Sequence, residues 1–143
     1  MLHISAVDVS DVDRAYAFYA PLMDALGRRL RLGDPATWAA WMPGGASRLL
    51  FLTGRPHDGG PASSGNGQMA RFLARERPIA ERCHALALPA DGTTEGSPGL
   101  RPHYRQDDYG AYFRDSSGNN RGRICRREPA RYAANCRSSP LTQ

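Results

Sequence analysis

The stretch 101–109 gathers side chains that bind small molecules well. It carries guanidinium, imidazole, phenol and carboxylate groups in the order Arg-Pro-His-Tyr-Arg-Gln-Asp-Asp-Tyr. Loops on rigid scaffolds often carry binding residues. Arg101, His103, Tyr104 and Tyr109 are therefore candidates to line a pocket for an anionic or aromatic ligand. In a purely structural alternative, the two tyrosines pack and Arg101 pairs with a neighbouring aspartate.

The histidines and cysteines form no recognised catalytic or metal-binding pattern. No two of the four histidines are spaced as His-x-x-x-His, the zinc spacing on a helix. The cysteines are odd in number and widely spaced, which argues against a disulfide framework and a zinc ribbon. The chain also lacks a Ser-His-Asp or Cys-His arrangement, a phosphate loop and a dinucleotide fingerprint. We interpret the cysteines as reduced thiols: Cys83, Cys125 and Cys136.

Length and composition indicate one ordinary globular domain. A chain of 143 residues, 41% hydrophobic and 23% charged, is long enough to bury a hydrophobic core without a disulfide or a structural metal to stabilise it. No apolar run approaches the roughly 18 residues that would span a bilayer, and the first residues do not resemble a secretory signal. We therefore expect a cytoplasmic protein that does not interact with membranes.

The positive charge of the chain does not indicate a nucleic-acid partner. The formal net charge is +5, and all nineteen basic residues are arginine. These arginines are scattered along the chain, so solvated faces explain most of them. The expected last strand carries several of them where apolar alternation is usual. It is therefore either an exposed edge, which charges protect from aggregation, or a degenerate segment.

The first part of the chain predicts a strand that leads into a helix. Residues 3–9 alternate as in a strand, and Ser10 with Asp13 resembles a capping box at a helix start. Pro21 lies inside the helical pattern and is expected to kink or split the helix. Gly27 is placed to end it. The apolar stripe that should pack on a sheet consists of Ala15, Phe18, Leu22 and Leu26.

The order of elements then repeats after a polar linker. Three strand-like runs follow the first helix and indicate a short antiparallel meander, at 28–33, 37–42 and 47–53. The second half shows strands near 68–74, 109–115 and 121–127 and a helix near 78–89. We expect one domain over 1–127, with modules at about 1–54 and 67–127, a linker at 55–66 and a polar tail at 128–143.

Several motifs occur in the order and spacing of a known superfamily. They are Val-Ser-Asp-Val-Asp-Arg at 9–14, Ala-Phe-Tyr at 17–19, Gly-Asn-Gly at 65–67, Gly-Leu-Arg-Pro-His-Tyr at 99–104, Tyr-Gly-Ala-Tyr-Phe at 109–113 and Asp-Ser-Ser-Gly-Asn at 115–119. With two βαβββ-like halves, the chain resembles the vicinal oxygen chelate superfamily, which includes glyoxalases, bleomycin resistance proteins and extradiol dioxygenases. The resemblance covers roughly residues 2–127. It implies an α+β fold in which two βαβββ modules form a curved mixed sheet around a cup.

The resemblance also implies a divalent metal in the cup, held by His, Gln or Glu residues, but the corresponding positions are unsuitable. They fall at Ile4, Met69 and Gly122. Isoleucine and glycine offer no donor atom, and a thioether suits copper(I) better than hard or borderline metals. We therefore expect no bound cofactor, with a divalent metal as the alternative.

The residues that remain favour a metal-free binding module for a small aromatic or anionic molecule. Trp38 and Trp41 are three apart in a strand and should face opposite sides. By parity, Trp41 and Met69 are possible cup-lining residues, and an apolar, aromatic cup suits an organic guest.

Two alternatives stay open. One is a lyase, isomerase or dioxygenase of the same superfamily with a rearranged metal site, in which His3, His103 or Glu95 substitutes. The other is a protein without a ligand whose fold serves self-association. Relatives of this fold commonly pair, so the resemblance also implies a homodimer.

Overall fold

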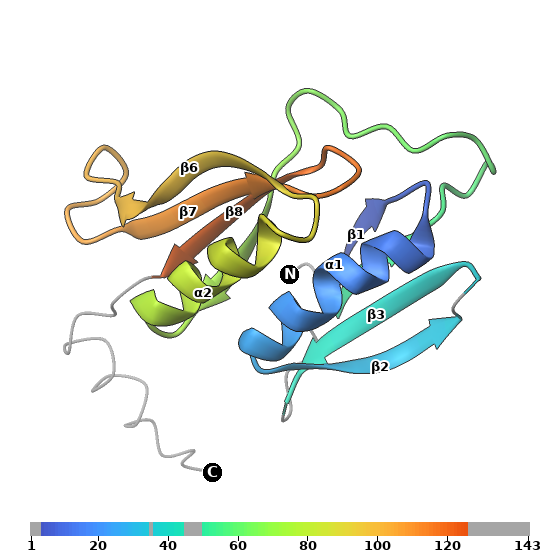
Figure 1. Ribbon diagram of the computed structural model, residues 1–143, viewed down its shortest axis with the longest axis horizontal. Helices are drawn as coiled ribbons and strands as arrows, with labels where there is room; N and C mark the ends of the chain where they lie inside the picture. The colour runs from blue at the N-terminus through green and yellow to red at the C-terminus, as the bar shows by residue number, and fades with distance from the viewer. Residues whose placement is uncertain (1–3, 35, 45–49, 126–143) are drawn as a thin grey trace, which may run out of the picture.

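The chain folds as two successive βαβββ modules (Figure 1). The computed structural model describes residues 4–34, 36–44 and 50–125; His3 and the expected tail at 128–143 lie outside them. The first module contains β1 (Ile4–Asp8), α1 (Val12–Ala25), β2 (Arg28–Asp34), β3 (Trp38–Pro43) and β4 (Leu50–Gly54). The second contains β5 (Ala70–Ala74), α2 (Arg77–Ala87), β6 (Thr93–Leu100), β7 (Tyr109–Arg114) and β8 (Asn120–Cys125). The predicted α+β class and repeated order are confirmed.

Each module builds a mixed four-stranded sheet with the same connectivity. The strand orders are β1-β4-β3-β2 and β5-β8-β7-β6. In both sheets the first and last strands of the module pair in parallel, while the other pairs are antiparallel. The expected meander is therefore confirmed for β2, β3 and β4, and β1 joins it as a parallel edge strand. Because β8 lies between β5 and β7, the interpretation of the last strand as an exposed edge is wrong.

Helix α1 begins and continues differently from the sequence prediction. Its N-cap is Asp11, whose carboxylate accepts from the Arg14 amide at 2.9 Å. The Ser10 hydroxyl instead accepts from the Ala62 amide, at 3.1 Å, and so ties the linker to the helix start. Pro21 lies inside one continuous helix, because buried residues on both sides of it hold the helix against the sheet. Gly27 follows the helix with φ +66°, a conformation that glycine adopts without strain.

Strand β6 has no sequence pattern that predicts it. It contains Gly96, Pro98 and Gly99, which weaken a strand prediction. β6 is an edge strand that pairs with β7 through a ladder with two irregularities, so it tolerates a residue without an amide donor. The segment is therefore a strand because it pairs with β7, and not because of the strand propensity of its own residues.

One hydrophobic core spans the two modules. Both helices cover one face of the sheets and pack against each other (Figure 1). Aromatic rings cross the boundary: Phe51 lies edge-on to Phe72 with ring centroids 4.8 Å apart, and Phe18 lies 6.1 Å from Phe113. All four rings belong to one buried cluster. Among the described residues, no helix is long and apolar enough to cross a membrane.

A buried carboxylate joins the modules through hydrogen bonds. Asp115 lies in the β7–β8 turn and accepts from the Tyr19 hydroxyl of α1 at 2.5 Å. It also accepts from the backbone amides of Ser117 and Asn119. The Asn119 side-chain amide donates to Asp115 and to the Asp8 carbonyl of β1. This network fixes the turn against the first module.

Replacing Tyr19 by Phe should lower the free energy of unfolding by about 1–3 kcal/mol, because a buried carboxylate loses a hydrogen-bond donor. Urea denaturation followed by circular dichroism measures this difference. The matched control is Tyr16→Phe on the exposed side of the same helix, with an expected change of less than about 0.5 kcal/mol. Equal effects of the two substitutions would contradict the assigned role of the Tyr19 hydroxyl.

His84 should make the stability of the fold depend on pH. Its ring is buried on α2, with Nε2 2.9 Å from the Thr94 hydroxyl, and burial lowers the pKa of the imidazole. Between the folded pKa and the usual value of about 6.5, the unfolded chain binds more protons, so stability is lost as the pH falls through this range. Denaturation midpoints between pH 7.5 and 5 should show a fall that His84→Gln reduces. His57→Gln, in the exposed linker, should leave the fall unchanged, and a fall insensitive to His84→Gln would disprove the assignment.

Candidate functional site

The three positions at which the resemblance implies metal ligands do not fit a divalent cation. Ile4 lies at the start of β1 with 56% of its surface exposed, and Met69 precedes β5 with 39% exposed. Gly122 lies within β8 and has no side chain. The described ranges also contain no group of three or more His, Cys, Asp or Glu residues placed to hold a metal ion. The donor set is therefore unsuited to this chemistry.

The residues considered as substitute ligands are engaged elsewhere. The His103 ring contacts the Tyr104 ring, with centroids 4.3 Å apart. The Glu95 carboxylate accepts from Nε of Arg114 at 2.6 Å. His3 lies outside the described residues. The structure thus does not bring His103 and Glu95 together as a ligand set.

A row of residues instead crosses the second sheet at the Gly122 position. Arg71 of β5 pairs with Gly122, Gly122 pairs with Tyr112 of β7, and Tyr112 pairs with Gly96 of β6. Residues in register across a sheet point to the same face. Phe72 and Phe113, which follow Arg71 and Tyr112, lie in the core beneath the helices. The row therefore lies on the helix-free face of the sheet, the face directed away from α2.

Glycines on β6 allow a second arginine to lie against this row. The Arg101 guanidinium carbon is 5.3 Å from the centre of the Tyr112 ring. Its Nη2 donates to the Ser97 carbonyl at 2.7 Å, and its Nη1 donates to the Leu100 carbonyl at 3.2 Å. A Cβ at Gly96 would come within 3.2 Å of both the guanidinium and the Tyr112 ring. Glycine at this position therefore lets the guanidinium pack against the phenol.

The 101–108 loop places Tyr104 over the first arginine of the row. The loop closes at its base through the Arg101 amide, which donates to the Asp108 carbonyl at 2.7 Å. The Arg71 guanidinium carbon lies 5.4 Å from the centre of the Tyr104 ring, within the range of a cation–π contact. We call Arg71, Arg101, Tyr104 and Tyr112 the arginine–tyrosine face. It presents two cations and two phenol rings on one side of the sheet.

The Tyr112 phenol stays protonated at neutral pH. Burial raises the pKa of Tyr112, and the neighbouring Tyr104 raises it further. The positive charges of Arg71 and Arg101 act in the opposite direction and are the smaller effect. A phenol with a raised pKa is a hydrogen-bond donor and not a base at neutral pH. Because the Tyr112 hydroxyl is itself buried, the exposed donors of the arginine–tyrosine face are those of Arg71 and Tyr104, and the arginines supply positive charge.

Two residues predicted to bind the ligand lie on the helix side of the sheets. The Tyr109 hydroxyl donates to the Glu81 carboxylate of α2 at 2.7 Å, and this hydrogen bond raises the pKa of Tyr109. Arg77 of α2 lies over the same ring. Trp41 is 2% exposed and stacks on Phe51 in the core. The two tryptophans occupy opposite faces as expected, but parity alone assigned Trp41 to the wrong one.

Met69 belongs to a polar pocket between the modules. The pocket has a volume of about 420 Å³ and is lined by residues of β1, of the start of β5 and of the linker, and both strands are edge strands of their sheets. Its lining residues are Ser5, Ala6, Val7, Asp8, Ser63, Gln68, Met69, Ala70 and Asn119. Met69 and Arg71 are two residues apart, so one strand carries both the pocket and the arginine–tyrosine face.

The sequence analysis identified Arg101, His103 and Tyr104 as one candidate group, and the structure places these three together. It missed Arg71 and Tyr112. A period-two signal was present for Arg71, which follows the candidate Met69 by two residues. For Tyr112 the alternation pointed the wrong way, because Tyr112 follows the candidate Tyr109 by three residues and so lies on the opposite face.

Comparisons with solved structures agree with this architecture. A glyoxalase/bleomycin resistance protein from Albidiferax ferrireducens is 29% identical to the chain with a TM-score of 0.77, over 89% of this chain and 99% of that one. A lactoylglutathione lyase from Agrobacterium tumefaciens is 21% identical with a TM-score of 0.59, over 87% and 92%. A glyoxalase/bleomycin resistance protein/dioxygenase family enzyme from Burkholderia phytofirmans is 14% identical with a TM-score of 0.64, over 86% and 96%.

No protein-family model matches the chain, and no curated protein matches it. The fold, the full-length superposition on these relatives and the ordered motifs agree with one another. The chain therefore has the glyoxalase/bleomycin resistance fold of the vicinal oxygen chelate superfamily.

Proposed function

We propose that the chain binds a small aromatic carboxylate at the arginine–tyrosine face, without a bound metal. The observation that carries the proposal is the register Arg71–Gly122–Tyr112. The Gly122 position, where the resemblance implies an anionic metal ligand, carries no side chain and lies in register between Arg71 and Tyr112. A guanidinium binds a carboxylate through two parallel hydrogen bonds, which gives both affinity and orientation.

The charges around the row support an anionic ligand. Arg71 is exposed, and no Asp or Glu among the described residues lies within ion-pair distance of it. Arg101 is held by two backbone carbonyls, so its charge is fixed in place without being neutralised. An anion between these groups would meet positive charge from two directions. The phenol rings of Tyr104 and Tyr112 supply flat surfaces for an aromatic ring.

The chemistry of these groups favours binding over catalysis. The four side chains of the arginine–tyrosine face include no carboxylate, thiol or imidazole, so none is a general base near neutral pH. The Albidiferax relative is named a glyoxalase/bleomycin resistance protein, so its name covers both an enzyme and a resistance protein, and the Agrobacterium relative is named a lactoylglutathione lyase. The donor set of this chain supports the role of a resistance protein, the sequestration of a small organic molecule, over that of an enzyme. The alternative of a metal-dependent lyase, isomerase or dioxygenase has no described ligand set to support it.

Binding of 2-naphthoate, measured by isothermal titration calorimetry, tests the proposal. Arg71→Ala should weaken binding about tenfold or more, because a carboxylate loses a charged hydrogen-bond partner worth about 1.5–3 kcal/mol. Arg75→Ala is the matched control, since Arg75 is an exposed arginine just beyond the same strand, and it should bind like the wild type. The uncharged 2-naphthamide should bind more weakly than the acid.

Two results would overturn the assignment. One is 2-naphthoate binding that Arg71→Ala and Tyr112→Phe both leave unchanged, since the ligand would then lie elsewhere. The other is equal affinity for the acid and the amide, since the arginines would then contribute no charge recognition.

Metal content is a separate test of the metal-free part of the proposal. After dialysis against trace zinc, manganese, iron and nickel, plasma mass spectrometry should find well under one metal ion per chain, because Ile4, Met69 and Gly122 supply no suitable donors. A value near one per chain would contradict the metal-free proposal and would make His3 and His103 the candidate metal ligands.

The proposal includes a homodimer, and only the resemblance to the superfamily supports this part of it. A homodimer would not by itself discriminate ligand binding from a purely self-associating role. Binding of 2-naphthoate that Arg71→Ala weakens would discriminate the two roles, because a protein that only self-associates is not expected to bind this ligand.

A further inference from the structure

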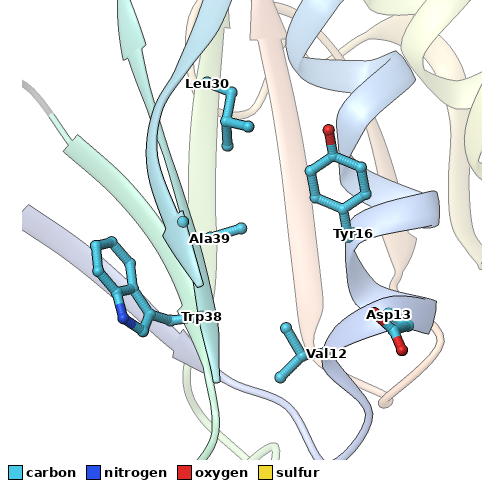
Figure 2. A pocket seen from close by; sticks show the side chains of 7 residues that line it. Val12, Asp13, Tyr16, Leu30, Trp38 and Ala39 are labelled. Carbon is cyan, nitrogen blue, oxygen red and sulfur yellow. The ribbon is translucent and has the colours of Figure 1, made fainter. Parts of the chain in front are cut away.

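A second cavity lies on the other side of the molecule, between α1 and the β2–β3 hairpin (Figure 2). Its volume is about 300 Å³, at the lower end of the range for small-molecule pockets. It is separate from the arginine–tyrosine face, because it lies in the first module on the helix side of the sheet. The lining residues are Val12, Asp13, Tyr16, Leu30, Gly33, Trp38 and Ala39.

An irregularity in β2 creates this cavity. Leu30 pairs with Trp41, but Leu32 pairs with Ala40, so Arg31 is an extra residue in the ladder. The shift places both Leu30 and Gly33 on the face of the sheet that is directed toward α1. Their strand partners on β3, Trp41 and Ala39, lie on the same face. β-Bulges commonly redirect side chains next to binding sites. Here the bulge brings a leucine to one end of the cavity and a residue without a side chain to the other.

Gly33 leaves the space that an ordinary strand residue would fill. Its backbone is not in the left-handed region, so the glycine is not required by φ. A Cβ at this position would meet the Trp38 carbonyl at 3.4 Å and Leu30 Cδ1 at 3.9 Å, which are ordinary contacts. A larger side chain at 33 would therefore be accommodated locally and would grow into the cavity.

The walls are aromatic and aliphatic, and part of them faces solvent. In Figure 2, Tyr16 and Val12 of α1 and Leu30 and Ala39 of the hairpin border the same gap, while the Trp38 ring points away from α1. The Tyr16 ring stacks on buried Trp41, with centroids 5.9 Å apart, which holds it as a wall. Tyr16 is 42% exposed and Leu30 47% exposed, so a ligand has access. The cavity therefore suits one aromatic ring.

The charge on the cavity wall itself is acidic, although the chain as a whole is basic. Asp13 is the one lining residue that is charged at neutral pH. The residues next to the lining residues in the sequence carry both signs, since Asp11 and Asp34 are matched by three arginines, Arg14, Arg29 and Arg31. A cation placed beside Asp13 thus meets negative charge.

We propose that this cavity binds a small aromatic amine. The ring lies between Tyr16 and Leu30, and the ammonium group extends to the Asp13 carboxylate at the rim. Such a ligand differs in charge from the carboxylate proposed for the arginine–tyrosine face, so the two sites select opposite classes of molecule.

Isothermal titration with 4-phenylbutylamine and with uncharged 4-phenyl-1-butanol tests the proposal. The two probes share ring and chain length, so their difference reports recognition of the ammonium group. The amine should bind about threefold to fivefold more tightly at low salt, the range expected for an exposed ion pair. This preference should vanish at about 1 M salt, where the Debye length falls to about 3 Å.

Three variants assign the binding to the cavity. Asp13→Asn should remove the preference for the amine and keep the affinity for the alcohol. Gly33→Leu should fill the cavity and weaken both probes at least tenfold, with a thermal melt to show that the variant is folded. Tyr16→Ala, on an exposed wall, should weaken both probes as well. Asp24→Asn, on the exposed part of the same helix, is the matched control and should leave both affinities unchanged.

Several outcomes would overturn the proposal. Equal affinities of the two probes would show that no carboxylate takes part. Unchanged binding in folded Gly33→Leu and in Tyr16→Ala would place the ligand elsewhere. A concentration-dependent dimer that Gly33→Leu dissociates would show that a second copy of the chain covers this face.

Discussion

The arrangement of the molecule depends on how it buries the Asp115 carboxylate. A carboxylate inside a protein is stable only when hydrogen-bond donors replace the water it has lost. Asp115 obtains donors from its own turn and from Tyr19, which lies 96 residues earlier in the chain. Asn119 of the same turn reaches the Asp8 carbonyl of β1. Satisfying this charge therefore fixes the end of β7 and the start of β8 against the first module. With the turn held there, β8 enters the sheet between β5 and β7, and Gly122 comes to lie between Arg71 and Tyr112.

The sequence predicted the elements whose signals are local, and its errors come from non-local effects. Alternation and apolar stripes indicated β1, α1, β5 and α2, and Gly27 marked the end of the first helix. Pro21 has a strong local preference against a helix interior, but burial of the residues on both sides of it maintains one helix. β6 is a strand because β7 offers it a partner, although glycine and proline weaken its own signal. The central position of β8 depends on pairing with strands from two other parts of the sequence, which its arginines obscured.

Only part of the candidate site was predicted, because its other residues meet through non-local strand pairing. The loop residues Arg101, His103 and Tyr104 are close in sequence, so their grouping was visible from the sequence. Arg71 and Tyr112 are 41 positions apart and meet only through the register of β5, β8 and β7. Alternation divides each strand into two faces but does not say which face a helix covers. That ambiguity explains why Trp41 was assigned to the cup while the structure buries it under α1.

The exchange of a metal-ligand position for glycine beside an arginine changes what the fold can do. A divalent metal offers an anion several coordination positions and polarises the oxygens that it binds. A guanidinium also attracts the anion and aligns it through two donors, but it has no vacant coordination position and stays charged at any physiological pH. Its attraction for a carboxylate therefore persists across the neutral range and depends on no supply of metal. It would give the ligand orientation without the polarisation that metal-assisted chemistry requires, and so, under the proposed function, an arginine beside this position supports recognition of an anion and not its conversion.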